Sequence, residues 1–219
     1  MVPAEPPSRP RCGLIGAPRT PWCYWVGVTH GVWEFPVALP RNAFNSREAP
    51  RAGDIWRAFQ DAATTSSIKA GWSPSRYREN RTSFLVYRMV VVHQGETHFG
   101  EPLHARTWVS DFRRRTLSTR QIRIRRGDQP LAAATQSWVH VDGQTLKPRQ
   151  ASADFAACYP VVELEPSVDL PDFEEQPGAE DVFSFQMWQT WSDPLGHANH
   201  PAYVDWCDEA SSRRMLAAG

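Results

Sequence analysis

Residues 191–206 of this chain read WSDPLGHANHPAYVDW and place an acid, two histidines, an amide and a glycine turn just before an expected helix. Pro201 suits the first position of that helix, and Asn199 or His200 can cap it. A carboxylate and imidazoles beside the free N–H groups of a helix N-terminus suit attack on a carbonyl group. The stretch therefore predicts a loop-to-helix element that carries a candidate catalytic site.

The chain before this stretch has the order strand, helix and four further strands. Apolar or alternating runs predict strands at 32–39, 84–92, 101–110, 117–126 and 131–141. A helix is expected from Gly53 to a C-cap at Gly71. Its buried face would carry Ile55, Phe59, Ala62 and Ser66, which keep helical spacing.

Two of the strand runs also predict where their side chains lie. The run 84–92 is the most apolar, so we expect it at the centre of the sheet, against the helix. In the run 117–126, the alternation predicts that Ile122 and Ile124 point inward while Arg123 and Arg125 point outward.

The C-terminal part repeats the beginning of this pattern. Residues 182–189 alternate like a strand, and the stretch after them repeats the loop-to-helix element of residues 40–71. The intervening segment is rich in Pro and acidic side chains, as linkers are. The predicted organisation is a disordered leader at 1–30, a first unit at 31–147, a linker at 148–181 and the start of a second unit at 182–219. This second unit stops within its helix, so we expect a truncated copy without its own sheet.

The opening stretch resembles the signature of the hotdog-fold thioesterases. Asp193, Gly196, His197, Asn199 and Tyr203 match the pattern Asp-x-x-Gly-His-x-Asn-x-x-x-Tyr at the same spacing. The resemblance implies an α+β hotdog fold, in which a bent antiparallel sheet wraps a long helix. It also implies that the incomplete second unit lies in tandem with the first.

Runs in the first unit extend the resemblance to double-hotdog acyl-ACP thioesterases and 4-hydroxybenzoyl-CoA thioesterase-like proteins. These are GEPL at 100–103, RTWV at 106–109 and WVHVD at 138–142. The plant members carry Asn where this chain has Leu195, so the plain Asp-x-x-Gly-His pattern of the bacterial relatives fits better.

The resemblance implies hydrolysis of acyl-CoA or acyl-ACP thioesters to free acid and thiol. Asp193 would be the nucleophile or the general base for water. Backbone N–H groups of Gly196 and His197 would polarise the carbonyl, and the His197 side chain would bind its oxygen or orient the acid. Asn199 would hold the loop or the substrate. Glu209 is a second candidate base, with a solvated helix charge as the alternative.

Substrate-binding candidates come from both units. They are Tyr203, Gln60, Arg113, Arg114 and Arg123. The arginines belong to a basic cluster, completed by Arg115, Arg120, Arg125 and Arg126, that would bind a phosphopantetheine phosphate or an acidic carrier protein. A solvated strand edge is the alternative interpretation. Asp61, next to Gln60, is a weaker candidate, and Cys207 is either a nucleophile or a core residue.

Composition excludes several other classes of protein. The 24 basic and 24 acidic side chains argue against nucleic acid or a membrane as a partner, and no long apolar run predicts a membrane span. The four cysteines lack zinc spacing, which favours free thiols in the cytoplasm. We therefore expect a cytoplasmic enzyme of fatty acid metabolism without metal or cofactor, a homo-oligomer or a pair of hotdog units. The alternatives are a hotdog hydratase or dehydratase and a non-catalytic acyl-thioester-binding module.

Overall fold

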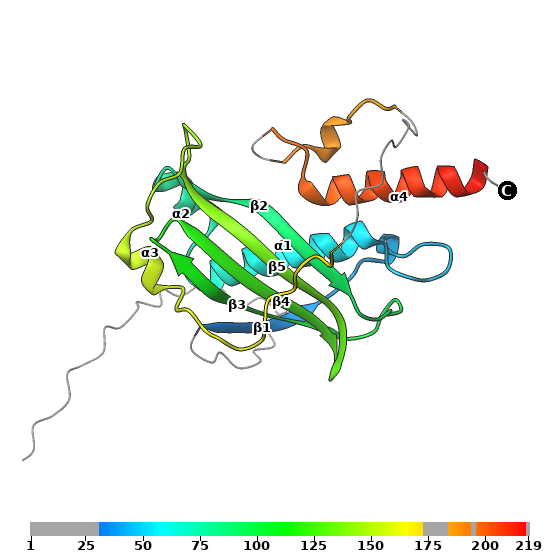
Figure 1. Ribbon diagram of the computed structural model, residues 1–219, viewed down its shortest axis with the longest axis horizontal. Helices are drawn as coiled ribbons and strands as arrows, with labels where there is room; N and C mark the ends of the chain where they lie inside the picture. Colours follow the sequence, from blue (N-terminus) through cyan, green and yellow to red (C-terminus); the bar gives the residue numbers. More distant parts are fainter. Residues whose placement is uncertain (1–30, 173–183, 194–195, 218–219) are drawn as a thin grey trace, which may run out of the picture.

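The computed structural model describes residues 31–172, 184–193 and 196–217 (Figure 1). The expected leader at 1–30 lies outside the described residues. The strands are β1 (Val32–Val37), β2 (Thr82–His93), β3 (Leu103–Arg113), β4 (Leu117–Arg126) and β5 (Gln129–Asp142). The helices are α1 (Ala52–Lys69), α2 (Pro74–Glu79), α3 (Ala153–Ala157) and α4 (His200–Ala217), with short 3₁₀ turns at Arg41–Ala43 and Gln189–Trp191. None of the described helices is long and apolar enough to span a membrane.

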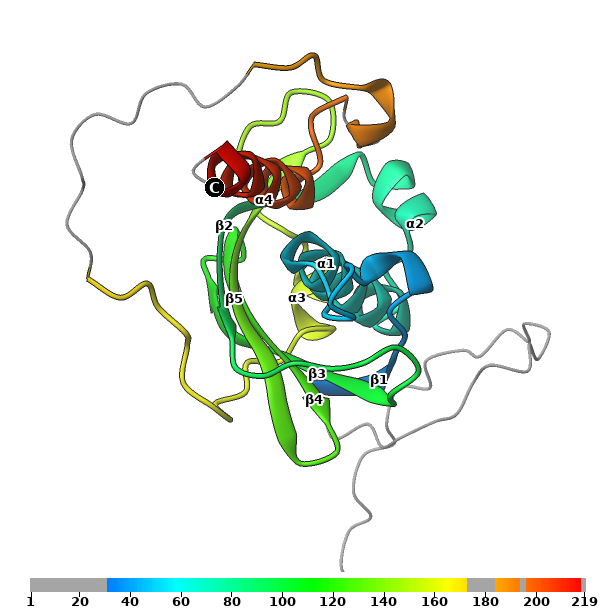
Figure 2. The ribbon, with the colours of Figure 1, turned by 90° about the vertical axis from the view of Figure 1, so that its right-hand side faces the viewer.

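The five strands form one antiparallel sheet in the order β1-β3-β4-β5-β2, which curves around α1 (Figure 2). The predicted inner face of α1 is confirmed, because Ile55, Phe59, Ala62 and Ser66 are all at most 2% exposed. Burial of each large apolar side chain on this face contributes roughly 1.5–3 kcal/mol. A long helix wrapped by a bent antiparallel sheet is the predicted hotdog arrangement.

The expected position of β2 was wrong. This strand lies at an edge of the sheet, where it pairs with β5, and Tyr87 on it is 59% exposed. The central strand is β4, whose Ile122 and Ile124 point into the core as predicted. A high apolar content indicates how much of a strand's two faces is buried, but it does not indicate whether the strand lies at the centre or at the edge of the sheet. β4 reaches the centre with an alternating sequence because a polar segment covers its outer face.

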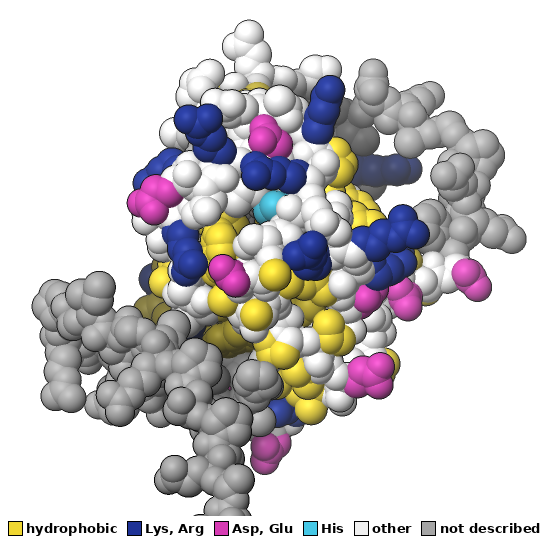
Figure 3. All heavy atoms as spheres, turned by 90° about the vertical axis from the view of Figure 1, so that its left-hand side faces the viewer, with side chains coloured by type: hydrophobic (Ala, Val, Ile, Leu, Met, Phe, Trp, Pro, Cys, Tyr) yellow, Lys and Arg dark blue, Asp and Glu magenta, His cyan; other side chains and the backbone are white. Residues whose placement is uncertain are grey.

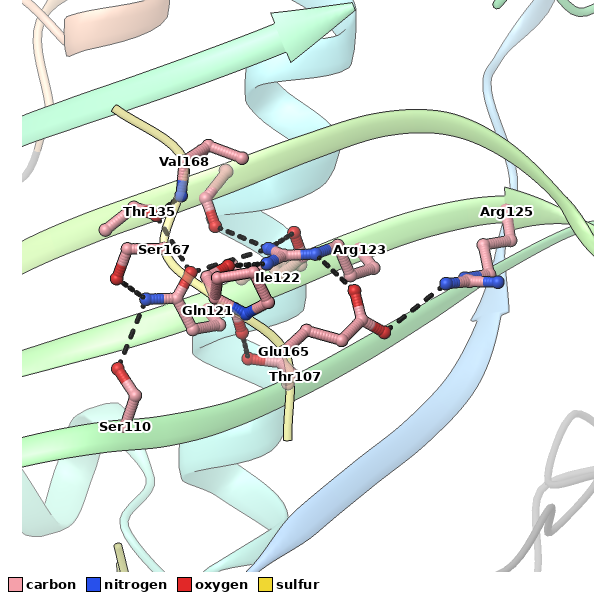
Figure 4. A network of polar contacts seen from close by, with 12 residues as sticks. Thr107, Ser110, Gln121, Ile122, Arg123, Arg125, Thr135, Glu165, Ser167 and Val168 are labelled. Atoms are coloured by element: carbon pink, nitrogen blue, oxygen red, sulfur yellow. Dashed lines mark hydrogen bonds and ion pairs between the residues drawn. The ribbon is translucent and has the colours of Figure 1, made fainter. Parts of the chain in front are cut away.

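That segment is a strap of residues 163–168, which crosses the outer face of β4 and β5 (Figure 4). Arg123 points outward as predicted, and its Nε donates to Glu165 Oε2 at 2.8 Å. Its Nη2 donates to the Pro166 carbonyl at 2.6 Å, which leaves the side chain only 7% exposed. Farther along, Gln121 Nε2 donates to Ser167 Oγ at 2.8 Å. The strap therefore supplies the acceptors that these outward polar side chains need.

The linker was predicted to begin too early. Within residues 148–172, α3 begins after Ser152, whose Oγ accepts from the Phe155 N–H at 3.1 Å. The Phe155 ring packs against Trp72 at 4.5 Å and Tyr159 at 4.8 Å between centroids, and it is 3% exposed. This segment and the strap therefore belong to the first unit. The Pro-rich, acidic composition hid a few aromatic side chains that complete the core.

The strand expected at 182–189 is not formed in the part of the chain that the structure describes. Residues 182–183 lie outside it, residues 184–188 have no regular structure, and Gln189–Trp191 form a 3₁₀ turn. The aromatic side chains pack on one another instead: Trp188 stacks on Trp191 at 5.2 Å and Trp191 meets Trp206 of α4 at 5.4 Å. Phe185 of the alternating run also reaches Trp206, at 5.0 Å between centroids, although its side chain stays 46% exposed.

Replacement of Glu165 tests whether the strap stabilises the sheet. Glu165→Gln removes the charge that pairs with the buried Arg123, so we expect the free energy of unfolding to fall by about 1–3 kcal/mol. Glu163→Gln, at an exposed position on the same strap, should change it by less than about 0.5 kcal/mol. Urea denaturation of both variants measures the difference. Equal stability of the two variants would show that the strap does not stabilise the sheet.

Candidate active site

The site lies where the N-terminus of α4 meets the middle of α1. The two helices run antiparallel (Figure 1), and the Arg57 guanidinium of α1 forms an ion pair with the Asp205 carboxylate of α4. One turn farther along α1, Asn199 Nδ2 donates to Gln60 Oε1 at 3.2 Å. These contacts place the predicted motif loop against the first unit.

The motif loop is a closed turn built around Asp193. Its N–H donates to the His197 carbonyl at 2.8 Å, and the Gly196 N–H donates back to the Asp193 carbonyl at 3.0 Å. The His197 N–H donates to the Asp193 carboxylate at 3.1 Å. Gly196 has φ +76, the left-handed region that glycine adopts without strain. The expected Leu195 departure lies outside the described residues.

The closed turn changes one expectation. The N–H groups of Gly196 and His197 were predicted to polarise a substrate carbonyl, yet both donate to Asp193 within the loop. In this structure the His197 N–H fixes the Asp193 carboxylate, whereas the Gly196 N–H closes the turn on the Asp193 backbone carbonyl. Other donors for a carbonyl oxygen lie nearby, on the paired amides of Asn199 and Gln60.

A cavity of about 530 Å³ adjoins the loop, within the range of small-molecule sites. Its polar wall comes from the motif and from α1, and its interior comes from aromatic residues of the sheet, α2 and α3. The polar wall comprises Asp193, His197, Asn199, His200, Gln60, Thr64 and Ser67. The aromatic interior comprises Trp72, Tyr77, Phe84, Phe112, Trp138, Phe155 and Tyr159. Such a cavity suits a substrate with a reactive polar group at one end and an apolar body.

Four predicted site residues come together at this wall: Asp193, His197, Asn199 and Gln60. Gly196 shapes the turn that holds them. Tyr203 and Glu209 do not line the cavity. Tyr203 is 56% exposed on α4, and Glu209 accepts from Arg213 Nε at 2.6 Å on its exposed face. Asp61 lies on another face of α1, where burial raises its pKa.

The predicted basic cluster is not one surface. Arg113, Arg114 and Arg115 lie at the β3–β4 turn, at the end of the sheet that Figure 3 shows, where basic side chains are interspersed with acidic ones. Arg123 and Arg125 pair with Glu165 on the outer face, and Arg126 pairs with Glu101. Arg120 points into the core. Strand alternation and the length of β4 separate residues that are close in sequence.

One residue of the cavity wall was missed as a site residue. His200, the first residue of α4, packs against the Trp56 ring at 6.2 Å between centroids. Its Nε2 is buried without a hydrogen-bond partner among the described residues. Burial lowers the pKa of His200, while the Asp193 carboxylate partly opposes this shift. The signal was its position within the motif, where the sequence suggested a helix cap and an imidazole beside the helix N-terminus but His200 was not among the named site residues. Cys207 is exposed on α4.

The buried histidines predict a stability that falls in weak acid. Burial lowers the pKa of His200 and His140 below the ordinary value of 6.5. The unfolded chain then binds more protons than the folded one near that pH, so stability is lost as pH falls below about 6.5. His200→Gln should flatten the fall in Tm between pH 7.5 and 5.5. His98→Gln, at an exposed position, should leave it unchanged, and an equal effect of both variants would refute the assignment to His200.

No family model and no curated protein sequence matches this chain. Among solved structures, it is similar to an acyl-ACP thioesterase from Bacteroides thetaiotaomicron, with a TM-score of 0.70 at 14% identity over 82% of this chain and 73% of that one. A putative oleoyl thioesterase from Lactobacillus plantarum gives a TM-score of 0.68 at 18% identity over 83% and 73%. A 12:0-ACP thioesterase from Umbellularia californica gives 0.64 at 12% identity over 83% and 75%. At these identities the likeness establishes the architecture, and we conclude that this chain has the hotdog fold.

Proposed function

We propose that this protein is a thioester hydrolase that acts on acyl groups carried by CoA or by an acyl carrier protein. The observation that carries the proposal is the Asp193 carboxylate, fixed by the motif loop at the wall of an aromatic cavity. The solved structures of similar fold named above include acyl-ACP thioesterases, which supports the same reaction class.

In the proposed reaction, Asp193 accepts a proton from a water molecule, whose oxygen attacks the thioester carbonyl. The tetrahedral intermediate collapses with cleavage of the C–S bond. The free carboxylic acid is formed and the thiolate leaves, and protonated Asp193 returns its proton to the thiolate, which gives the free thiol and restores the carboxylate. Asn199 donates one amide hydrogen to Gln60, so the remaining amide hydrogens of this pair can stabilise the developing oxyanion.

We also propose that α4 is the helix of a second hotdog unit in tandem with the first. The antiparallel packing of α1 and α4 supports this (Figure 1). Pairing of units, within one chain or in a homo-oligomer, would then complete the enclosure of the site. The free thiols of Cys158 and Cys207 support a reducing compartment such as the cytoplasm, and acyl substrates support a place in fatty acid metabolism.

A substrate panel tests the proposal. The purified chain is incubated with saturated acyl-CoA and acyl-ACP thioesters, and free thiol is detected with a colorimetric reagent. We expect thiol release above the uncatalysed rate. A 2-enoyl-CoA is included, because loss of its double bond without thiol release would indicate the hydratase alternative. Binding of the thioesters without either reaction would indicate a non-catalytic module.

A further inference from the structure

The inner end of the cavity contains a buried arginine without a counter-charge. Arg120 lies on β4 two residues before Ile122, so strand alternation directs it inward, and it is 6% exposed. Its Nη1 donates to Ser66 Oγ at 2.6 Å and to Thr107 Oγ1 at 3.2 Å. Its partners are hydroxyls and aromatic rings, and no carboxylate in the described part of the chain forms an ion pair with it. Its guanidinium therefore has donors to spare.

Two further donors line the same cavity as Arg120. Trp72 Nε1 and Tyr159 Oη are buried, and Trp72 Nε1 has no hydrogen-bond partner among the described residues. Tyr159 Oη faces the hydroxyls of Tyr77 and Ser67, in contacts that lack full hydrogen-bond geometry. Both side chains are 4% exposed and pack on Phe155. Most buried polar groups in proteins are hydrogen-bonded, so an unpartnered indole N–H and a poorly satisfied hydroxyl in the same cavity as an unpaired cation require an explanation.

Packing within the protein explains only part of this arrangement. The Arg120 guanidinium lies 5.8 Å from the Trp33 ring centre and 5.6 Å from that of Tyr159, within the range of cation–π attraction. Such contacts offset only part of the cost of burying an unpaired charge, and this burial lowers the pKa of Arg120. The ring contacts also provide no acceptor for the Trp72 indole N–H. An anionic group in this cavity would supply the missing counter-charge for Arg120 and an acceptor for donors on the cavity wall.

The distance between this cluster and the motif matches the length of a medium-length acyl chain. Arg120 contacts Ser66 of α1, whereas the motif contacts Gln60 of the same helix. Six residues of α-helix span about 9 Å. A medium-length acyl group whose carbonyl lies at Asp193 would therefore place its far end near Arg120.

We propose that the cavity takes acyl thioesters whose far end carries a carboxylate, which Arg120, Tyr159 and Trp72 bind. The proposal rests on the proposed function for the position of the thioester. It deepens that function by naming the substrate class, half-thioesters of medium-length dicarboxylic acids.

Matched substrates test this inference. Thiol release is measured for octanoyl-CoA against suberoyl-CoA and for hexanoyl-CoA against adipoyl-CoA, pairs that differ only in the terminal carboxylate. We expect kcat/KM to favour a carboxylated member about tenfold or more, the ratio that about 1.4 kcal/mol gives. Arg120→Gln should abolish the preference, and Arg120→Lys should restore part of it because the charge is kept without the planar fork.

Tyr159→Phe keeps the inference testable if the arginine variants fail to fold, because it removes only a hydroxyl. It should lower the preference for suberoyl-CoA severalfold, and an unaltered preference would overturn the inference. A preference for octanoyl-CoA, or for its ω-hydroxy derivative over suberoyl-CoA, would also overturn it.

Binding separates this inference from the proposed function. Calorimetry with uncleavable thioether analogues of octanoyl-CoA and suberoyl-CoA reports the inner end of the cavity without any reaction. Tighter binding of the carboxylated analogue that Arg120→Gln abolishes supports the inference even if no thioester is hydrolysed, in which case only the proposed function fails. Equal binding of the two analogues by the unaltered protein overturns the inference.

Discussion

Asp193→Asn is expected to lower kcat for thiol release by about 10²–10⁴, the contribution of a well-placed general base. The amide has nearly the size of the carboxylate, and its Oδ1 can still accept from the His197 N–H that holds the loop. The substitution therefore removes the proton acceptor and retains the turn. The measurement is steady-state thiol release, with the melting temperature recorded to verify that the variant is folded.

Glu209→Gln is the matched control, because sequence reasoning offered both carboxylates as candidate bases. Glu209 lies on the exposed face of α4 in an ion pair with Arg213, and it does not line the cavity. We expect its kcat to stay within about twofold, since exposed ion pairs contribute little. If Glu209→Gln loses as much activity as Asp193→Asn, the assignment of Asp193 as the general base is wrong.

The parts of the fold that sequence predicted correctly have a periodic signal on one element. Ile55, Phe59, Ala62 and Ser66 repeat at helical spacing, and all four lie in the core. Ile122 and Ile124 alternate with Arg123 and Arg125, and this alternation correctly predicts that the isoleucines face the core. A period fixes which side of an element is apolar, because one side must be buried whatever lies opposite. It does not identify what covers that side.

The features that sequence missed depend on contacts between distant segments. Phe155 lies in a Pro-rich, acidic stretch without any period, so nothing local indicates that it enters the core. Arg120 is more instructive. The alternation that directs Ile122 inward directs Arg120 inward as well, but its charge suggested a place with its solvated neighbours. The available signal was that Arg120 lies two residues before Ile122 and so shares its face of the strand. Its side chain accordingly lines the cavity.

Phe155→Ala is expected to lower the free energy of unfolding by about 3–5 kcal/mol, as for other buried phenylalanines. The ring contacts Trp72, Phe84 and Tyr159, which belong to three different segments of the first unit. Its loss leaves a void that these rings cannot close without moving away from β2 and from the segments next to α2 and α3. Urea denaturation measures the change.

Leu164→Ala is the control for Phe155→Ala, because it truncates an apolar side chain that is 41% exposed in the same expected linker. It should cost less than about 1 kcal/mol. A connecting segment would tolerate both substitutions equally, whereas a segment that completes the core tolerates only the exposed one. A small effect of Phe155→Ala would therefore return residues 151–168 to the linker. Such a result would also show that Phe155 does not hold Tyr159 and Trp72 in place, and the donor groups proposed to act with Arg120 would then lack a fixed position.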